Sequence, residues 1–228
     1  MNRTKKSDIL WALEIPECRE REANFMRICA ALWAVAMAAL CQAGDPARRP
    51  QAVTVVAEAE QALPAGVFAA LKQETDRLFS PLGLRLEWAL REEAGANLEA
   101  DIIVFVRFRG RCRPAREPLP ARDGQVMART HASDGVLLPF SEVECESVLR
   151  QVRPALAGLD RSGSEILLGR ALGRVVAHEI LHVLLQRKDH AVRGIFRREL
   201  SLRQLVEEFP PEAEEGRISL EFAGEPAS

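Results

Sequence analysis

The stretch from Ala171 to Leu200 reads ALGRVVAHEILHVLLQRKDHAVRGIFRREL, and it decides how the rest of the chain is interpreted. It contains an H-E-x-x-H motif at His178, Glu179 and His182, and His190 follows. Residues four apart lie on one face of an α-helix, so His178 and His182 can hold one metal ion. Glu179 lies off that face, where it can act as a general base on a water at the metal. The motif therefore predicts Zn²⁺ bound by histidines, with His190 as the third ligand.

The helix that carries the motif is otherwise apolar. Apolar runs at 175–177 and 183–185 flank the motif. Burying two imidazoles and a carboxylate in such a stripe is unfavourable unless something binds them. A metal ion is the simplest partner, and the alternative is a structural helix whose polar residues satisfy one another in a core.

Signals for the start and the packing of this helix lie upstream of the motif. Ser162 and Glu165 have the spacing of a capping box, which predicts a helix with Ser162 as its N-cap. Gly169 and Gly173 share one face of the helix, and each glycine costs about 1 kcal/mol relative to alanine. We therefore expect a sheet or a second helix to approach closely along this strip.

The third ligand requires the chain to turn after the helix. On a straight helix His190 would lie about 120° around the axis from His178, so the polar run at 186–189 must end the helix first. We place the third ligand on His190 because neutral imidazole is a good zinc donor and the chain has only four histidines. The acidic alternatives are Asp189, Glu199 and the pair Glu207-Glu208.

From Ala171 to Leu200 the chain resembles the active-site helix of zincin metallopeptidases, most closely the metzincin side of that group. It is also similar to uncharacterised secreted bacterial zincin-like proteins. The resemblance implies an α+β fold: a zincin-like single domain in which a small mixed sheet, with an edge strand, packs on the HExxH helix. It also implies peptide-bond hydrolysis, with Zn²⁺ on His178, His182 and His190 and with Glu179 as the base.

The sequence departs from the metzincin pattern in three places. Leu185 stands where the pattern has a glycine, and His190 comes two residues later than the usual third histidine. No methionine follows Met127, so the methionine of the usual hydrophobic turn is missing. We expect the Gly-Ile-Phe run at 194–196 to take its place beneath the metal.

The chain contains no tyrosine, so the tyrosine hydroxyl that stabilises the oxyanion in some zincins has no counterpart. Zinc, a backbone N–H on the edge strand or His131 could take this part. His131 lies in a predicted loop at 130–135, where a solvated side chain is the simpler interpretation.

Residues 1–43 are interpreted as an N-terminal extension and signal peptide, with the signal at 26–43, and residues 44–228 as the domain. The run from Ile28 to Cys41 is uncharged and apolar, too short to span a bilayer comfortably but typical of a signal core. We therefore expect cleavage after Ala43 and a secreted or periplasmic location. The alternatives are lipidation at Cys41 and an uncleaved membrane anchor.

The charge balance and the cysteine content limit the classes of binding partner. The 31 Lys and Arg nearly balance the 33 Asp and Glu, which argues against a nucleic-acid partner. The basic stretch at 107–116 is interpreted as a solvated loop or as a contact for an acidic substrate.

Export leaves Cys112 and Cys145, which we expect to form a disulfide. A thiol that caps the zinc is the alternative. We expect a monomer that acts on a peptide or protein, with no membrane partner unless the signal stays uncleaved.

Hydrophobic patterning predicts strands interspersed with helices. Strands are expected at 53–56, 84–90, 102–106, 125–130 and 136–138, the third of them buried on both faces. Helices are expected at 63–79, at 141–152 before Pro154, from Ser162 through the motif, and at 201–208. One of the strands at 125–130 and 136–138 is the candidate edge strand that could bind an extended peptide. This order is α+β and is also the order in zincin N-terminal subdomains.

The function that we expect is zinc-dependent hydrolysis of peptide bonds by an exported enzyme. The alternative is a non-catalytic zincin-like zinc-binding or interaction module. A fourth protein ligand on the metal would favour that alternative, because closed coordination is typical of structural zinc.

Overall fold

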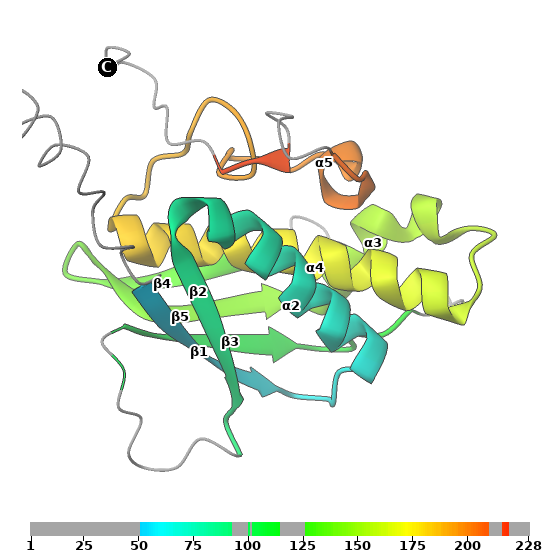
Figure 1. Cartoon of the computed structure of the whole chain (residues 1–228), viewed down its shortest axis with the longest axis horizontal. Coiled ribbons are helices and arrows are strands. Elements are labelled where there is room, and N and C mark those ends of the chain that lie inside the picture. The colour runs from blue at the N-terminus through cyan, green and yellow to red at the C-terminus, as the bar shows by residue number, and fades with distance from the viewer. Residues whose placement is uncertain (1–50, 93–99, 101, 115–125, 210–215, 219–228) are drawn as a thin grey trace, which may run out of the picture. The chain divides into compact units, whose positions relative to one another are not determined.

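The described part of the chain is built around a five-stranded mixed β-sheet (Figure 1). The computed structural model describes residues 51–92, 100, 102–114, 126–209 and 216–218. The strands are β1 (Gln51–Ala59), β2 (Leu84–Leu90), β3 (Ile103–Arg109), β4 (Ala128–Ser133) and β5 (Val136–Glu144). They follow the order β2-β1-β3-β5-β4, and all neighbours are parallel except β4, which pairs antiparallel with β5 at one edge. The predicted α+β class, with a mixed sheet and an edge strand, is confirmed.

Helices cover one face of this sheet. In the described residues they are α2 (Ala65–Phe79), α3 (Cys145–Leu156), α4 (Arg161–Leu185) and α5 (Leu202–Val206), and a 3-10 turn, η1 (Ser80–Leu82), follows α2. α2 and α4 lie side by side on the sheet (Figure 1). The core between the layers contains Val53, Val55, Val104, Val106 and Phe108 from the sheet and Leu71, Phe79, Leu168, Leu172 and Val176 from the helices.

β3 is buried on one face only, which corrects the prediction of a strand buried on both. Val104, Val106 and Phe108 are 0%, 1% and 0% exposed and face the helices. Phe105 and Arg107 alternate with them on the other face and are only partly buried. The apolar run at 102–106 suggested two buried faces because Phe105 is apolar, but side chains alternate along a strand and arginines continue the open face.

The segment after Val136 stays extended for longer than predicted. β5 reaches Glu144 because its residues from Phe140 onward pair with β3, and this long-range pairing outweighs the local helical pattern from 141 onward. α3 then continues past Pro154 to its end at Leu156, which corrects the predicted stop before the proline. Pro154 lies in the last turn of α3, so the helix ends two residues after it. β4 likewise begins later than the predicted residue 125, which lies outside the described residues.

α4 begins before the predicted N-cap. Its N-cap is Asp160, whose carboxylate accepts a hydrogen bond from the backbone N–H of Gly163 at 2.7 Å. Ser162 therefore lies inside the first turn, and the predicted capping box is wrong. Aspartate is as good an N-cap as serine, and its charge also suits the positive end of the helix dipole. The capping box in this chain is at Ser201 and Gln204, at the start of α5.

Gly169 and Gly173 lie where α4 meets α2, as predicted for contact with a second helix. A Cβ atom at Gly169 would collide with the carbonyl oxygen of Val67, and one at Gly173 would lie 2.9 Å from that of Leu71. The two glycines therefore let the backbones of α2 and α4 approach closely and fix the position of α4 along α2.

A buried ion pair joins α4 to α2 and α5. Arg174, which is 1% exposed, donates to Oε1 of Glu74 at 2.6 Å and to the carbonyl oxygen of Gln204 at 2.6 Å. Burial by itself would raise the pKa of Glu74, but hydrogen bonds from Arg77 and the charge of Arg174 outweigh burial and hold the pKa below 4.5. Glu74 is therefore ionised at neutral pH.

No helix among the described residues is long and apolar enough to cross a bilayer. The described residues belong to a compact unit that starts at Arg49. The predicted signal peptide and its cleavage point after Ala43 lie outside the described residues.

Candidate metal centre

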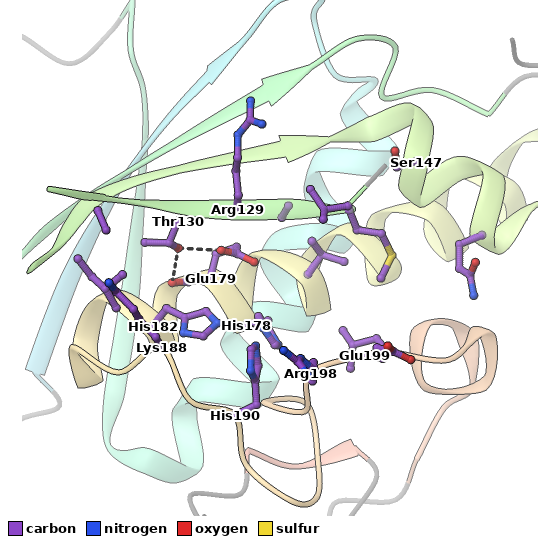
Figure 2. A pocket seen from close by; sticks show the side chains of 18 of the residues that line it. Arg129, Thr130, Ser147, His178, Glu179, His182, Lys188, His190, Arg198 and Glu199 are labelled. Atoms are coloured by element: carbon purple, nitrogen blue, oxygen red, sulfur yellow. Dashed lines mark hydrogen bonds between the residues drawn. The ribbon is translucent and has the colours of Figure 1, made fainter. Parts of the chain in front are cut away.

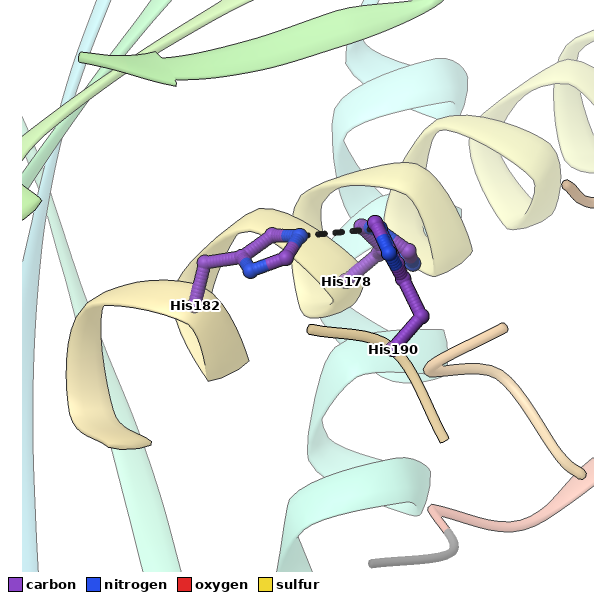
Figure 3. Close-up of side chains that lie close together, drawn as sticks. All are labelled: His178, His182 and His190. Carbon is purple, nitrogen blue, oxygen red and sulfur yellow. Dashed lines mark hydrogen bonds between the residues drawn. The ribbon is translucent and has the colours of Figure 1, made fainter. Parts of the chain in front are cut away.

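Three imidazoles meet near the carboxyl end of α4 (Figure 3). His178 and His182 are one turn apart on α4, and His190 follows in the loop after it. One ring nitrogen from each of the three lies within 4.8 Å of the other two. The ring centroid of His190 is 5.1 Å from that of His178 and 4.9 Å from that of His182. The structure thus brings the three predicted ligands together.

Backbone carbonyls fix the tautomers of the two helical histidines. Nδ1 of His178 donates to the carbonyl oxygen of Ile195 at 3.1 Å, and Nδ1 of His182 donates to that of Arg187 at 2.6 Å. A carbonyl can only accept, so each neutral ring carries its proton on Nδ1 and a bare lone pair on Nε2. The two Nε2 atoms lie 3.2 Å apart (the dashed line in Figure 3), so two lone pairs face each other with no proton between them.

A cation between the rings would relieve this contact. Tetrahedral Zn²⁺ with Zn–N bonds of about 2.0–2.1 Å holds its ligand nitrogens about 3.3–3.4 Å apart, close to the 3.2 Å between the two Nε2 atoms. Hydrogen bonds from Nδ1 to carbonyls are the outer contacts that orient metal-binding histidines. Burial lowers the pKa of His178 to about 4 and also lowers the pKa of His182 and His190, so all three are neutral at pH 7. The donor set therefore suits a divalent ion such as zinc.

A left-handed residue reverses the chain after α4. The helix ends at Leu185, and Gln186 adopts a φ of 51°, a conformation that favours glycine. The side-chain amide of Gln186 accepts from the N–H of Leu137 in β5 at 3.1 Å and donates to its carbonyl oxygen at 3.0 Å. These bonds hold Gln186 in place. The chain therefore turns at Gln186. This is one residue later than position 185, at which the metzincin pattern has its glycine.

Phe196 forms the floor of the cluster. Its ring centroid lies 5.3 Å from that of His178, 4.8 Å from that of His182 and 5.8 Å from that of His190. Gly194, with a φ of 70°, makes the turn that precedes it. The Gly-Ile-Phe run therefore lies next to the three histidines, as expected, and its Ile195 carbonyl also orients His178.

Among the described residues, the acidic alternatives lie outside the cluster. The side chain of Asp189 is 81% exposed and lies 4.0 Å from the arginine two residues before it. Glu207 and Glu208 form ion pairs with arginines of α5 and α4. Glu199 lines the cleft beside the cluster without belonging to it. Of these candidates, His190 is therefore the one that lies with His178 and His182.

Glu179 is held beside the cluster by a hydrogen bond from the edge strand. Oγ1 of Thr130 donates to Oε2 of Glu179 at 2.7 Å (Figure 2), and the hydroxyl of Ser141 lies 2.9 Å from Oγ1 of Thr130. Glu179 is 6% exposed. Burial raises its pKa to about 7, against the opposing effect of the Thr130 hydrogen bond. With Oε2 anchored, Oε1 is the oxygen able to accept a proton, and a pKa near neutrality suits a general base.

The cluster opens into a cleft of about 840 Å³ between β4 and the loop after α4 (Figure 2). Among the described strands β4 pairs with β5 alone, so its outer backbone edge is available to an extended chain. The residues that line the cleft include Met127 just before β4, Thr130 and Ala132 of β4, Ser147 and Gln151 of α3, and Lys188, Arg198 and Glu199 of the loop.

His131 faces away from the cleft. It lies in β4 rather than in a loop, and neighbouring side chains on a strand point to opposite faces. Its Nε2 lies 3.2 Å from Oε2 of Glu142, and its ring centroid lies 4.9 Å from that of Phe140. The suggestion that His131 stabilises an oxyanion is therefore wrong. A bound metal ion, if the histidines hold one, and a backbone N–H of β4 are the other two candidates for stabilising an oxyanion.

The basic stretch at 107–116 is not a loop throughout. Arg107 and Arg109 lie in β3 on the open face of the sheet, where they pair with Glu58 and Glu60 at 3.0 and 3.4 Å. Arg116 lies outside the described residues. The described arginines of this stretch do not line the cleft, so a contact with an acidic substrate at the metal cannot come from them.

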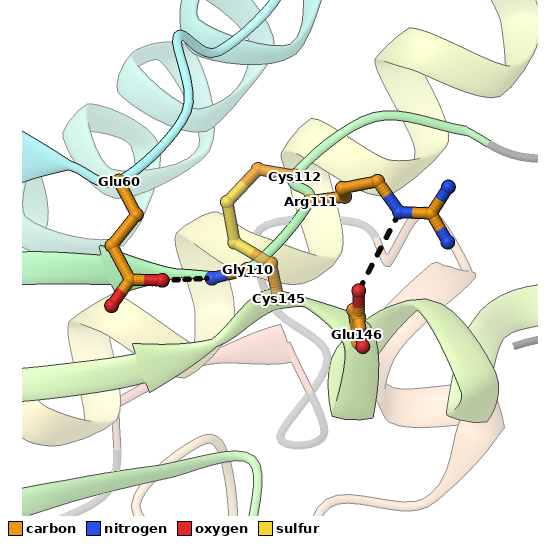
Figure 4. Close-up of a disulfide and its surroundings, with 6 residues drawn as sticks. All are labelled: Glu60, Gly110, Arg111, Cys112, Cys145 and Glu146. Atoms are coloured by element: carbon orange, nitrogen blue, oxygen red, sulfur yellow. Dashed lines mark hydrogen bonds and ion pairs between the residues drawn. A yellow bond between two sulfur atoms is a disulfide. The ribbon is translucent and has the colours of Figure 1, made fainter. Parts of the chain in front are cut away.

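Cys112 and Cys145 form the predicted disulfide, with their Cα atoms 4.9 Å apart (Figure 4). Cys112 follows β3, and Cys145 is the first residue of α3, the helix that closes one end of the cleft. Beside the bond, Arg111 pairs with Glu146 at 3.5 Å. Because both sulfur atoms form the disulfide, neither is free to cap a zinc ion as the alternative required.

Three residues of the site were missed in the sequence. Thr130 had only an indirect signal, its place in a candidate edge strand. Ser141 was assigned to a helix, and Gln186 to a polar run that merely ends one. Thr130 and Gln186 act through contacts with segments 49 residues away, and Ser141 acts through its partner strand in the β4–β5 hairpin, which local spacing does not reveal.

Comparisons with known proteins found no match among protein-family models, curated proteins or solved structures. The chemistry of the centre is therefore inferred from its own side chains.

Proposed function

We propose that this chain is an exported zinc-dependent peptidase of zincin-like fold, with His178, His182 and His190 as zinc ligands and Glu179 as general base. The observation that carries the proposal is the pair of bare Nε2 atoms 3.2 Å apart, with a third imidazole and a buried carboxylate beside them. Three protein ligands leave one position on the metal for water or substrate, which is the arrangement of catalytic zinc.

Each side chain has a defined part in hydrolysis. A bound zinc ion would polarise the substrate carbonyl and lower the pKa of a coordinated water from about 16 toward about 7. Glu179 takes a proton from the attacking water and passes it to the leaving amine, and its pKa of about 7 suits both transfers. Thr130 anchors the second carboxylate oxygen. The free edge of β4 offers backbone N–H and C=O groups to an extended peptide.

The arrangement of elements supports the zincin-like assignment. A strand, a helix and two strands precede the β4–β5 hairpin, and the motif helix follows α3. The edge strand β4 contacts the motif helix through Thr130 and Glu179. The Cys112–Cys145 bond supports export, because such bonds persist mainly in oxidising compartments.

The alternative, a non-catalytic zinc-binding module, has less support. Structural zinc sites are closed by four protein ligands. In the described part of the chain the cluster contains three, and it opens into a cleft. Both features favour catalysis.

Glu179→Gln tests the proposal. Zinc content and cleavage of a broad peptide library would be measured for the mature protein, this variant and Asp134→Asn, a matched carboxylate-to-amide control in the β4–β5 turn. We expect one zinc per chain in all three. Turnover in Glu179→Gln should fall below about 1% of the wild type, since general-base catalysis contributes about 10²–10⁴-fold.

Two results would contradict this. Turnover above that level in Glu179→Gln, with zinc in place, excludes Glu179 as the base. A zinc-loaded wild type that cleaves no peptide of the library rejects the peptidase and favours the zinc-binding module.

A further inference from the structure

The two ends of the cleft differ, and the contacts of Gln186 show which residues lie at each. Gln186 bonds to Leu137, and Leu137 pairs with Ala132 across the β4–β5 hairpin. Lys188 follows Gln186 by two residues and lines the cleft, so it lies at the Ala132 end of β4. Met127 lies at the opposite end, next to the start of α3.

The direction of a bound peptide follows from the free edge of β4. Antiparallel pairs are somewhat more stable than parallel ones, so we take a peptide on this edge to run opposite to β4. Its N-terminal part then lies beside Ala132 and Lys188, and its C-terminal part beside Met127. The metal centre lies between these two ends.

Lys188 lies at this end of the cleft without a carboxylate partner among the described residues. It is exposed beside His182 (Figure 2), and in the described residues it has no ion pair or hydrogen bond. Arg129, by contrast, pairs with Glu142 at 2.7 Å. Asp189 follows Lys188 in the sequence but does not line the cleft. The Ala132 end of the cleft therefore carries an uncompensated positive charge.

The charges at the other end are mixed. Arg198 and Glu199 are adjacent in the sequence, and both line the cleft beyond His190 (Figure 2). Arg150, on α3, donates to the hydroxyl of Ser147 at 3.0 Å. Because a carboxylate lines this end together with the arginines, we take it to select less strongly for one sign of charge than the end at Lys188.

We propose that the cleft selects peptides with an acidic side chain on the N-terminal side of the cleaved bond, and that Lys188 recognises this side chain. The inference rests on the proposed peptidase function and names its substrate class. Lys188 offers an ammonium with three N–H donors and no internal partner. An exposed ion pair of this kind gives a preference of about two- to fivefold, and the preference falls as salt screens the charges.

Matched peptides test the proposal. They share one sequence and carry Asp, Asn or Lys at one position, on either side of the cleaved bond, and each is made with a free or an amidated C-terminus. Cleavage positions are assigned by mass spectrometry. In the wild type, kcat/KM should be about two- to fivefold higher for Asp than for Asn on the N-terminal side.

Two substitutions separate Lys188 from general charge effects. Lys188→Gln should abolish the preference, and Lys188→Glu should replace it with a preference for Lys over Asn at the same position. Arg197→Glu makes the same charge change in the same loop, at an exposed residue that does not line the cleft, and should keep the wild-type preference.

The possible failures are distinguishable. Equal cleavage of all peptides overturns the substrate preference and leaves the peptidase intact. A preference only on the C-terminal side, or only for a free C-terminus, overturns the assigned position of the acidic group.

If no peptide is cleaved, recognition by Lys188 is tested without catalysis. Binding of the same peptides to zinc-loaded Glu179→Gln is then measured by fluorescence anisotropy. Tighter binding of Asp over Asn that depends on Lys188 supports the recognition, and equal or absent binding rejects it.

Discussion

The hydroxyl of Thr130 and the carboxylate of Glu179 lie 2.7 Å apart and join the sheet edge to the motif helix. The strand that is positioned to pair with a peptide therefore also holds the proposed general base. Ser141, which is 0% exposed, lies 2.9 Å from the same hydroxyl and supports it from β5. Thr130 favours the ionised form of a carboxylate that burial would otherwise keep protonated.

Thr130→Val should therefore lower kcat by about 10- to 150-fold, because a hydrogen bond to a charged group is worth about 1.5–3 kcal/mol. KM and zinc content should change little, since the backbone of β4 and the three histidines are unaltered. Thr130→Ser keeps the hydroxyl and should restore most of the activity. Wild-type kcat in Thr130→Val would show that the hydrogen bond does not support the base, because valine keeps the shape and methyl group of threonine and removes only the donor.

His190→Ala and His131→Ala form a matched pair for the metal. His190 belongs to the cluster, so its loss should weaken zinc binding by more than the 10–100-fold typical of an outer partner. His131 faces Glu142 on the other side of β4, and its removal should leave zinc affinity unchanged. Competition with a chromophoric chelator measures both. Wild-type affinity in His190→Ala would reject His190 as ligand and direct attention to Glu199.

Replacing Gln186 with alanine should destabilise the fold more than replacing it with glycine. Both substitutions remove its two hydrogen bonds to Leu137, but alanine must also adopt the left-handed conformation with a φ of 51°. That conformation costs a residue with a Cβ about 1–2 kcal/mol. Urea unfolding of the metal-free protein should therefore rank wild type, Gln186→Gly and Gln186→Ala in order of falling stability. An alanine variant as stable as the glycine variant would show that the turn carries no strain.

The Glu74–Arg174 pair should make stability depend on pH. The folded-state pKa of Glu74 lies below its ordinary value of 4.5. Its ionised form therefore stabilises the fold above pH 4.5, and this contribution is lost as the pH falls through the folded-state pKa. Glu74→Gln should cost about 3 kcal/mol at pH 7, because it leaves Arg174 buried without a counter-charge.

The measurement is urea unfolding of wild type and Glu74→Gln from pH 7 downward. The difference between them should shrink below pH 4.5, while Glu87→Gln, in an exposed ion pair on β2, should cost under about 1 kcal/mol at every pH. A Glu74→Gln penalty that does not change with pH would mean that shape, not charge, makes the contact.

The parts of the centre that were predicted correctly depend on short spacing. His178 and His182 share a helix face because of their separation in the sequence alone, and His190 needed only a turn between it and α4. The disulfide followed from two cysteines remaining after the expected export. None of these predictions required knowledge of which strand pairs with which.

The parts that were wrong or missed depend on strand register. Thr130 faces Glu179 and His131 faces Glu142 because β4 pairs with β5 in one register, with an irregularity between Thr130 and Ala132. A local pattern does not fix that register, so His131 was assigned to a loop and Thr130 was overlooked. Ser141 was likewise assigned to a helix, because its pairing partner, Val106, lies far away in the chain.

The Cys112–Cys145 bond makes one end of the cleft depend on the redox history of a preparation. The bond holds the first residue of α3, and Ser147 and Gln151 of that helix line the cleft, whereas the histidines lie on α4 and its loop. Protein made in a reducing cytosol would keep its cluster of three histidines and lose the tether on this wall. Metal content alone would then be a poor quality check. Substrate selection is best measured on protein recovered from an oxidising compartment.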